Sequence, residues 1–287
     1  MKEKIYIFYC ITISLLFLKI EAISQPYIDV ASMRYVISPA KTPNNKDEIA
    51  TPLNYFNFSI TAPIQFNQKK NAIILSPFFE RWQTSVDSVH VFHNFHYGLV
   101  LPVSLITPIS NSNWSLLTTV IVRMNDATIN RSGEWQLGGA LIANYKKSAK
   151  LIYKLGVYMN GDFFGLFMVP LLGIDWQISD RENLFGILPA QLTYEYKLSK
   201  HFFTGAVFRT FTNSYHDSED NYMRIDENQL GLFFDTYMGK KILLNLEAGH
   251  SILRKIRTGP HYEIDNFWNR QDNFYIKFMI AYRFRFR

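Results

Sequence analysis

The chain has almost no cysteine and, after its first two dozen residues, no long hydrophobic run. Its only cysteine is Cys10, so the remainder can form neither disulfides nor thiolate metal sites. No later stretch reaches the roughly 18 consecutive apolar residues of a membrane-spanning helix. These absences exclude a disulfide-stabilised scaffold and a helical membrane protein.

The N-terminal segment has the pattern of a secretory signal peptide. Lys2 and Lys4 precede an apolar stretch over 5–18, and Ala22-Ile23-Ser24 has the small residues of a cleavage site. We therefore expect a signal peptide at residues 1–24 and one exported domain at 25–287. An uncleaved membrane anchor is the alternative.

Aromatic residues are abundant, whereas the net charge is small. Aromatics make up 16% of the chain and the formal charge is +6. The cations are spread along the sequence instead of forming a basic patch, so we expect no nucleic-acid partner.

The last fifteen residues alternate strictly between two kinds of side chain. One parity is entirely apolar, and it consists of Phe274, Ile276, Phe278, Ile280, Tyr282, Phe284 and Phe286. The other parity includes Lys277, Arg283, Arg285 and Arg287. Because a strand directs alternate side chains to opposite faces, this pattern predicts a strand with one lipid-facing side in a transmembrane barrel. We expect the three arginines to lie toward the periplasmic rim, solvated or facing phosphates, and not in a selectivity filter.

Similar alternation of period two recurs along the chain and predicts an all-β, antiparallel, up-and-down barrel. Thirteen candidate segments are found: 27–37, 54–66, 71–82, 90–105, 114–125, 134–145, 150–161, 166–178, 184–197, 201–214, 227–238, 241–253 and 273–287. Bacterial barrels have an even strand number, and both turns that flank 184–197 are short and polar, as periplasmic turns are. We therefore predict that 184–197 does not cross the membrane and that the barrel has about 12 strands, with 14 as the alternative. Segments 215–226 and 254–272 are expected to be outer loops.

The run from Pro170 to Tyr215 carries a distinctive combination of residues: Asp175, Trp176, Asp180, Leu184, Phe185, Gly186, Pro189, Arg209 and Asn213. This combination resembles an uncharacterised outer-membrane β-barrel family of Bacteroidetes-type bacteria, a domain of unknown function. The resemblance implies an outer-membrane barrel and supplies no substrate. Tyr282, Phe284 and Phe286 have the aromatic register of a C-terminal insertion signal, although the chain ends one residue later on Arg287.

The parity opposite to the apolar face places charged side chains in the lumen. These are Glu80, Arg123, Lys154, Asp175, Arg209, Asp235, Glu247 and Lys277. An arginine or lysine facing lipid at mid-membrane would cost about 2–4 kcal/mol, which supports this assignment. The eight residues either form a solute-selecting constriction or pair with one another to fill a narrow barrel.

Catalytic, cofactor and metal sites are not predicted. His90 and His96 share one strand face while His93 points to the other, so they do not converge on one ion. The acidic segment 216–221 lacks the spacing and glycine of a calcium loop. It could instead pair with the basic segment 254–272, which could also contact lipopolysaccharide phosphates. His250 and Ser251 are adjacent on a strand and cannot form a dyad on their own.

The sequence thus predicts a barrel of the bacterial outer membrane that is a narrow channel or carrier for small or amphiphilic solutes. Its expected partners are outer-membrane lipid, lipopolysaccharide and the barrel-assembly machinery. A non-transporting structural or binding barrel that acts through its outer loops is the alternative, and a barrel enzyme is a third.

Overall fold

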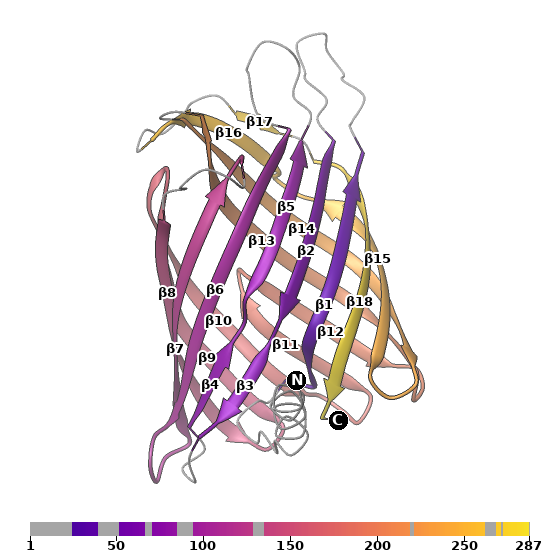
Figure 1. Cartoon of the computed structure of the whole chain (residues 1–287). Coiled ribbons are helices and arrows are strands. Elements are labelled where there is room, and N and C mark those ends of the chain that lie inside the picture. Colours follow the sequence, from indigo (N-terminus) through magenta and orange to yellow (C-terminus); the bar gives the residue numbers. More distant parts are fainter. Residues whose placement is uncertain are drawn as a thin grey trace, which may run out of the picture.

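The computed structural model is a closed antiparallel β-barrel of fourteen strands (Figure 1). It describes residues 25–39, 52–66, 71–84, 94–128, 135–218, 221–261, 268–270 and 272–286. Among the described residues, no helix is long and apolar enough to cross a lipid bilayer. The predicted signal peptide lies outside the described residues.

The barrel wall follows the order of the chain. The first strands are β1 (Tyr27–Ser38), β2 (Leu53–Ile60), β3 (Ala62–Gln65), β4 (Ala72–Leu75), β5 (Phe78–Thr84), β6 (Phe95–Pro108), β7 (Trp114–Asp126), β8 (Trp135–Ser148) and β9 (Leu151–Asp162). The others are β10 (Gly165–Gln177), β11 (Glu182–Leu188), β12 (Gln191–Lys197), β13 (Phe202–Ser218), β14 (Asn221–Met238), β15 (Ile242–Ser251), β16 (Lys255–Pro260), β17 (Trp268–Arg270) and β18 (Phe274–Arg285). Four strands of the wall are each interrupted once, so each consists of two consecutive pieces: β2 and β3, β4 and β5, β15 and β16, and β17 and β18. β1 pairs with β18 and closes the barrel.

The strand number corrects the sequence prediction of about 12 and agrees with the alternative of 14. Segment 184–197 is not a single strand that fails to cross. It forms most of a hairpin, β11–β12, whose two strands pair with each other and with β10 and β13. Each strand has seven residues, fewer than the 9–11 residues of a usual membrane-spanning strand. The turn at Pro189-Ala190 therefore lies partway up the wall (Figure 1).

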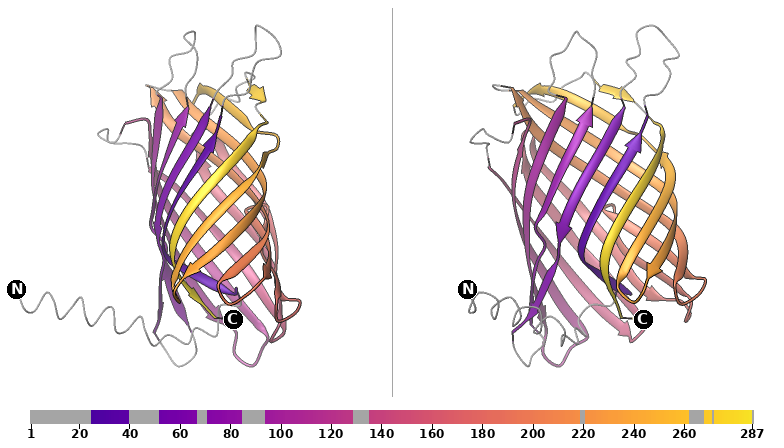
Figure 2. Two further views of the ribbon diagram at one scale, coloured as in Figure 1. Left: turned by 90° about the vertical axis from the view of Figure 1, so that its right-hand side faces the viewer. Right: turned by 45° about the vertical axis from the view of Figure 1, so that its right-hand side comes forward.

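The start of β1 and the end of β18 lie at the same end of the barrel, where Phe286 donates its amide hydrogen to the carbonyl of Pro26 (2.9 Å). We call this the terminal end and the opposite one the far end. Both turns that flank the β11–β12 hairpin are at the terminal end (Figure 1), as the sequence predicts. The strands are strongly tilted relative to the barrel axis (Figure 2).

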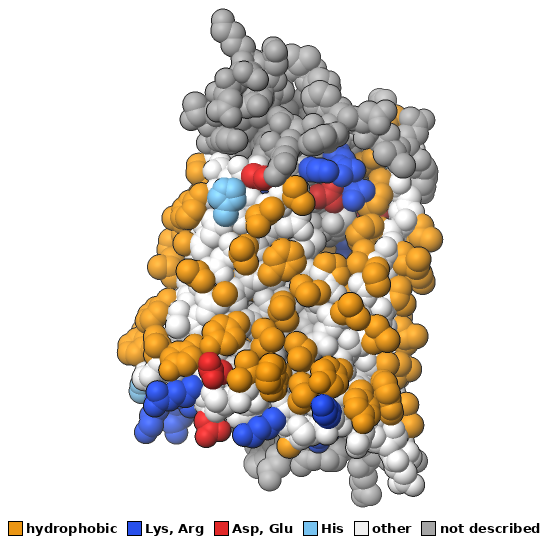
Figure 3. Space-filling model, turned by 180° about the vertical axis from the view of Figure 1, so that it is seen from behind, with side chains coloured by type: hydrophobic (Ala, Val, Ile, Leu, Met, Phe, Trp, Pro, Cys, Tyr) orange, Lys and Arg blue, Asp and Glu red, His pale blue; other side chains and the backbone are white. Residues whose placement is uncertain are grey.

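The barrel exterior is apolar over most of its height. Figure 3 shows hydrophobic side chains over the back of the barrel, with charged side chains toward its two ends. Leu166 and Leu232 are 77% and 71% exposed, whereas the charged side chains of the same strands, such as Asp175 and Asp235, are buried. The period-two pattern thus separates an apolar outside from a polar lumen.

The far half of the lumen is filled by side chains. A buried cluster comprises Val36, Leu53, Tyr55, Trp82, Tyr215, Met223, Ile225 and Tyr275. Its members in 215–226 belong to β13 and β14, so the prediction of an outer loop there is wrong. The same holds for part of 254–272, because β16 pairs with β14. The upper part of β13 reaches across to β7, where Ala127 donates its amide hydrogen to the carbonyl of His216 (2.9 Å).

A glycine makes the short hairpin possible. Gly186 has a φ of 140°, which L-residues with side chains rarely adopt. A Cβ placed there would lie 2.2 Å from the carbonyl oxygen of Gln191. The close pairing of β11 with β12 therefore needs glycine at this position.

Candidate functional site: two cavities in the lumen

The lumen contains two cavities that meet at the tip of the β11–β12 hairpin. One, of about 340 Å³, lies toward the terminal end and is lined mainly by charged and polar side chains. The other, of about 410 Å³, lies above the hairpin tip. Arg34, Ile187 and Ala190 line both. We call them the charged cavity and the amphipathic cavity.

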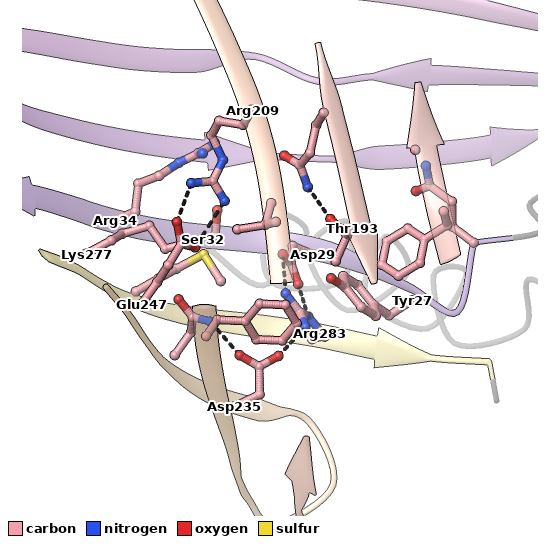
Figure 4. A pocket seen from close by; sticks show the side chains of 18 of the residues that line it. Tyr27, Asp29, Ser32, Arg34, Thr193, Arg209, Asp235, Glu247, Lys277 and Arg283 are labelled. Carbon is pink, nitrogen blue, oxygen red and sulfur yellow. Dashed lines mark hydrogen bonds and ion pairs between the residues drawn. The ribbon is translucent and has the colours of Figure 1, made fainter. Parts of the chain in front are cut away.

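Glu247 is the centre of the charged cavity (Figure 4). It accepts two hydrogen bonds from the Arg209 guanidinium, at 2.7 and 3.1 Å, and one from the hydroxyl of Tyr275 at 2.8 Å. Lys277 forms a further ion pair with the same carboxylate. β13, β15 and β18 each contribute one of the three charges, so the group ties together strands far apart in sequence.

A second ionic group lies nearer the terminal end. Arg283 donates to Asp235 at 3.0 Å and to Asp29 at 2.9 Å, and these three side chains converge in Figure 4. Arg285 pairs with the buried Glu195. The expectation that Arg283 and Arg285 are solvated at the rim is therefore wrong, because both carry carboxylate partners inside the barrel. Arg287 lies outside the described residues.

The amphipathic cavity has a polar wall built around Glu80. This carboxylate accepts hydrogen bonds from the hydroxyls of Tyr215 (2.7 Å) and Tyr55 (3.0 Å) and from the side-chain amide of Asn213 (3.1 Å). Arg123 donates to the side-chain oxygen of Asn213 at 3.1 Å, and also to the Tyr158 hydroxyl. Every direct partner that the described residues supply to Glu80 and Arg123 is neutral.

The opposite wall of this cavity is apolar. Ala140 and Ile142 come from β8, Phe167, Val169 and Leu171 come from β10, and Ile187, Pro189 and Ala190 come from the hairpin and its tip. A cavity with one polar and one apolar wall suits a ligand that has a polar head and an apolar body.

Arg34 lies at the junction of the two cavities. Its Nε donates to the side-chain oxygen of Asn57 at 3.1 Å, and it forms no ion pair with any residue in the described ranges. In Figure 4 its side chain runs toward that of Arg209. Arg34 is therefore a lumen cation whose charge is not neutralised by direct contact with a carboxylate of the described chain.

The eight charged residues predicted for the lumen fall into separate groups in the structure. Arg209, Glu247 and Lys277 form one group, and Asp235 belongs to the Arg283 group. Glu80 and Arg123 are bridged by Asn213, while Lys154 and Asp175 form an ion pair of their own at 2.7 Å. Neighbour pairing is thus extensive, and any role of these residues in solute selection stays a prediction.

Sequence reasoning did not single out Arg34, Asp29 or Glu195. Arg34 lies on β1, where apolar residues such as Met33, Tyr35 and Val36 occur on both parities, so no lumen face is marked. Asp29 and Glu195 each lie beside a C-terminal arginine in space. Those arginines are on the same strand face as the predicted lumen residue Lys277. This shared face was the sequence feature that could have placed them, and their carboxylate partners, in the lumen.

The family-like motif surrounds the hairpin. Asp175 and Trp176 lie on β10 and Asp180 lies in the following turn, while Leu184, Phe185, Gly186 and Pro189 build β11 and its tip, and Arg209 and Asn213 lie on β13. Tyr282, Phe284 and Phe286 lie in or next to β18 at the terminal end. Their use as an insertion signal stays a prediction.

Histidine and serine do not assemble in the way a dyad would need. His250 donates its Nδ1 hydrogen to the carbonyl of Ser251 at 2.7 Å, and within the described ranges no hydrogen bond is found between this ring and a serine hydroxyl. The Ser251 hydroxyl donates instead to Glu227. His96 is buried against Asp217 at 2.8 Å, and His90 and His93 lie outside the described residues. Within the described ranges, no group of three or more potential metal ligands occurs.

The ion pairs of the basic segment are made with two acidic residues that follow the predicted segment 216–221, and the predicted pairing with 216–221 itself stays a prediction. Arg254 forms an ion pair with Glu227, and Arg257 lies 3.5 Å from Asp226. These contacts connect β14 to β16 and to the residues just before it, which makes this end of the wall a structural element and not a pair of free loops.

Comparison with known proteins identifies a family. The model of the family described as "Domain of unknown function (DUF6268)" matches residues 24–287, so the chain belongs to this family. The predicted resemblance to a barrel family of unknown function agrees with this result, and the predicted bacterial group stays a prediction. No curated protein matches the sequence.

Several solved structures resemble the barrel. An outer-membrane channel from Pseudomonas putida F1 is 12% identical with a TM-score of 0.48, covering 88% of this chain and 94% of that one. A mutant of the TodX monoaromatic hydrocarbon channel is 10% identical with a TM-score of 0.44, covering 95% and 94%. The NanC porin is 7% identical with a TM-score of 0.41, covering 88% and 98%. All three TM-scores are below 0.5, so no conclusion about a solute is drawn from these similarities.

Proposed function

We propose that this member of the DUF6268 family is an outer-membrane β-barrel that serves as a narrow channel or carrier for small amphiphilic solutes. The observation that carries the proposal is the pair of adjoining lumen cavities, one with an apolar wall and one lined by charges. A lumen that only had to be filled would pack side chains throughout, as barrels of eight strands do.

Placement in a membrane is supported by the barrel exterior. A closed barrel satisfies its backbone hydrogen bonds internally, and residues such as Leu166, Leu232 and Met168 present a highly exposed apolar surface. By this proposal the terminal end is periplasmic and the far end extracellular, as short turns at one end and longer connections at the other indicate.

The test is transport by the purified protein in liposomes. We expect uptake of an amphiphile such as decyl sulfate above that of protein-free liposomes, and little flux of sugars or small inorganic ions, because the far half of the lumen is filled. Absence of both binding and uptake for decyl sulfate and for its cationic analogue decyltrimethylammonium would refute the proposal.

The second candidate is a binding barrel that does not transport. The buried cluster around Tyr215 and Met223 favours it, because it closes the far half of the lumen. Equilibrium binding of decyl sulfate to the protein without its transfer into the liposome interior would select this candidate.

A further inference from the structure

The wall of the barrel has a gap above the β11–β12 hairpin. β10 pairs with β9 along its whole length, from Gly165 to Trp176, but its pairing with β11 begins only at Leu172. On the other side of the hairpin, the pairing of β13 with β12 ends at Arg209. Above these points no described strand lies between β10 and β13 in the wall, so the two strands have facing edges without a ladder.

Proline occupies the exposed edge of β10. Gln177 donates its amide hydrogen to Lys150 beside β9, whereas Ile178 donates to Glu182 on the β11 side. Even-numbered residues of β10 therefore direct their backbone groups toward β11 and, higher up, toward the gap. Pro170 is one of these residues and has no amide hydrogen to leave unpaired, which suits an edge.

The amphipathic cavity extends to this gap. Consecutive residues of β13 face alternately into and out of the barrel, yet Thr210, Phe211, Thr212 and Asn213 all line the cavity. Because the ladder of β13 with β12 has ended by this point, the presence of Thr210 and Thr212 beside Phe211 and Asn213 in the lining places the cavity at the free edge of β13. The hairpin tip, at Pro189 and Ala190, forms the floor of the same opening.

The route along the barrel axis to the far end is blocked by the cluster around Tyr215, Met223 and Ile225, all of which are fully buried. Ser214 of β13 reinforces this block, since its hydroxyl contacts Asp162 (2.9 Å) and the side-chain amide of Gln136 (3.0 Å). Among the described residues, the gap and the charged cavity are then the openings that we assign to the amphipathic cavity.

We propose that an amphiphilic anion passes sideways from the outer leaflet through the β10–β13 gap into the amphipathic cavity, with its head group at Arg34. This inference rests on the proposed function and names the route and the class of solute. The apolar wall of β10 and of the hairpin lies next to the gap, and the polar wall of β1, β2 and β5 lies across the cavity. A solute that enters head first thus meets Arg34 at the far wall, beside the hydrogen-bonded carboxylate of Glu80, while its tail stays among apolar side chains.

The head group decides selectivity. A tail that leaves lipid for an apolar cavity gains little, because lipid tails are as apolar as the cavity wall. Arg34 lacks a carboxylate partner among the described residues and lies toward the like charge of Arg209 in Figure 4. An anion at this position gains charge-assisted hydrogen bonds and relieves that repulsion. A cationic head group would add to the repulsion, and the one carboxylate nearby, Glu80, already accepts three hydrogen bonds.

The route is tested by filling the gap in proteoliposomes. Decyl sulfate is added to the outer leaflet, and its arrival is followed with cyclodextrin trapped inside. Thr212→Trp places a large side chain at the free edge of β13, and we expect the initial rate to fall at least tenfold. Thr118→Trp, on the exposed face of β7 away from the gap, is the matched control and should retain the wild-type rate.

A cysteine variant that is labelled after folding provides a second test, in which loss of uptake cannot be attributed to misfolding. Residues 25–287 contain no native cysteine, so Thr212→Cys can be folded first and then modified with a benzyl methanethiosulfonate. Uptake should fall on labelling and return on reduction. Wild-type uptake by both Thr212→Trp and the labelled cysteine variant would overturn the lateral route and leave the proposed function standing.

The head-group site is tested by charge. Arg34→Gln should weaken decyl sulfate binding about tenfold, equivalent to about 1.4 kcal/mol, and Arg34→Lys should restore much of the affinity. Arg81→Gln, which removes a cation that lines neither cavity, should have no effect. Equal affinity of Arg34→Gln and wild type, or equal wild-type affinity for decyl sulfate and decyltrimethylammonium, would overturn the assignment.

Discussion

Removal of the Glu247 charge is the most direct probe of how the lumen is stabilised. In Glu247→Gln, the carboxylate that pairs with both Arg209 and Lys277 becomes neutral. The two cations are 5% and 4% exposed, so water can replace little of the lost interaction. Gln229 is the other side chain that accepts a hydrogen bond from Arg209 (3.2 Å), and it carries no charge.

The expected loss follows from the number of charges left unpaired. Breaking a buried pair by removing one partner typically destabilises a protein by about 3–5 kcal/mol. Here one substitution strips two buried cations of their carboxylate, so we expect at least 3 kcal/mol. Because each 1.4 kcal/mol is a factor of ten, the ratio of folded to unfolded protein should fall more than about a hundredfold.

The assay is urea-dependent folding into lipid vesicles, followed by tryptophan fluorescence. Lys277→Met should cost less than Glu247→Gln, because Glu247 keeps its two bonds to Arg209. The double variant should be less destabilised than the sum of the single variants, by about 0.5–3 kcal/mol of coupling. A loss below 1 kcal/mol in Glu247→Gln, or strict additivity, would refute the view that this group is an electrostatic unit.

Three further perturbations test the hairpin, the exterior and the far-end block. Gly186→Ala should destabilise the barrel by about 1–3 kcal/mol in the same folding assay, because it combines strain at positive φ with a close backbone contact; Gly161→Ala, whose Cβ would meet its nearest atom at 3.6 Å, should be nearly neutral. Leu232→Arg, at a site expected near mid-membrane, should lower the free energy of unfolding by about 2–4 kcal/mol. Leu166→Arg, near the far end, should lower it by only about 0–1 kcal/mol. Equal losses would contradict the proposed membrane placement. Met223→Ala should cost about 2–5 kcal/mol, and planar-bilayer recordings should show a conductance that the wild type lacks, whereas a silent variant of normal stability would argue against a block at this point.

Periodicity made the barrel wall predictable. The apolar parity of β18, with Phe278 and Ile280 outside and Lys277 inside, is reproduced in the structure, as is the separation of Leu232 from Asp235 on β14. Such alternation reflects the two environments on either side of one sheet and needs no knowledge of distant contacts. Most strand bounds therefore lie close to the predicted segments.

The hairpin was missed because its turn has weak local chemistry. Two-residue hairpin turns usually contain glycine or asparagine, whereas this one is Pro189-Ala190. With seven residues on each side, the two strands together have the length of one spanning segment. In the structure Gly186 permits the close pairing of the two strands, and Pro189 forms part of the turn.

The far-end strands were missed for a different reason. Segment 215–226 is rich in charge, which is typical of a loop, but Met223 and Ile225 alternate with Arg224 and Asp226. The charged members are accommodated by partners distant in sequence, such as Arg257 for Asp226. Tertiary pairing of this kind cannot be read from local pattern, and the lumen cations Arg283 and Arg285 were misplaced for the same reason.

The hairpin and the unpaired arginine are parts of one arrangement. Because β11 and β12 end partway up the wall, β10 and β13 lose their ladder above Pro189-Ala190, and the amphipathic cavity borders on that opening. Elsewhere in the charged cavity each cation has a carboxylate within direct contact, as Arg209 and Lys277 do with Glu247. Arg34 departs from this rule at the place where the two cavities meet. Arg34 is half-buried and faces the cavities instead of a carboxylate partner, so its guanidinium is available to the head group of the anion proposed to enter through the gap.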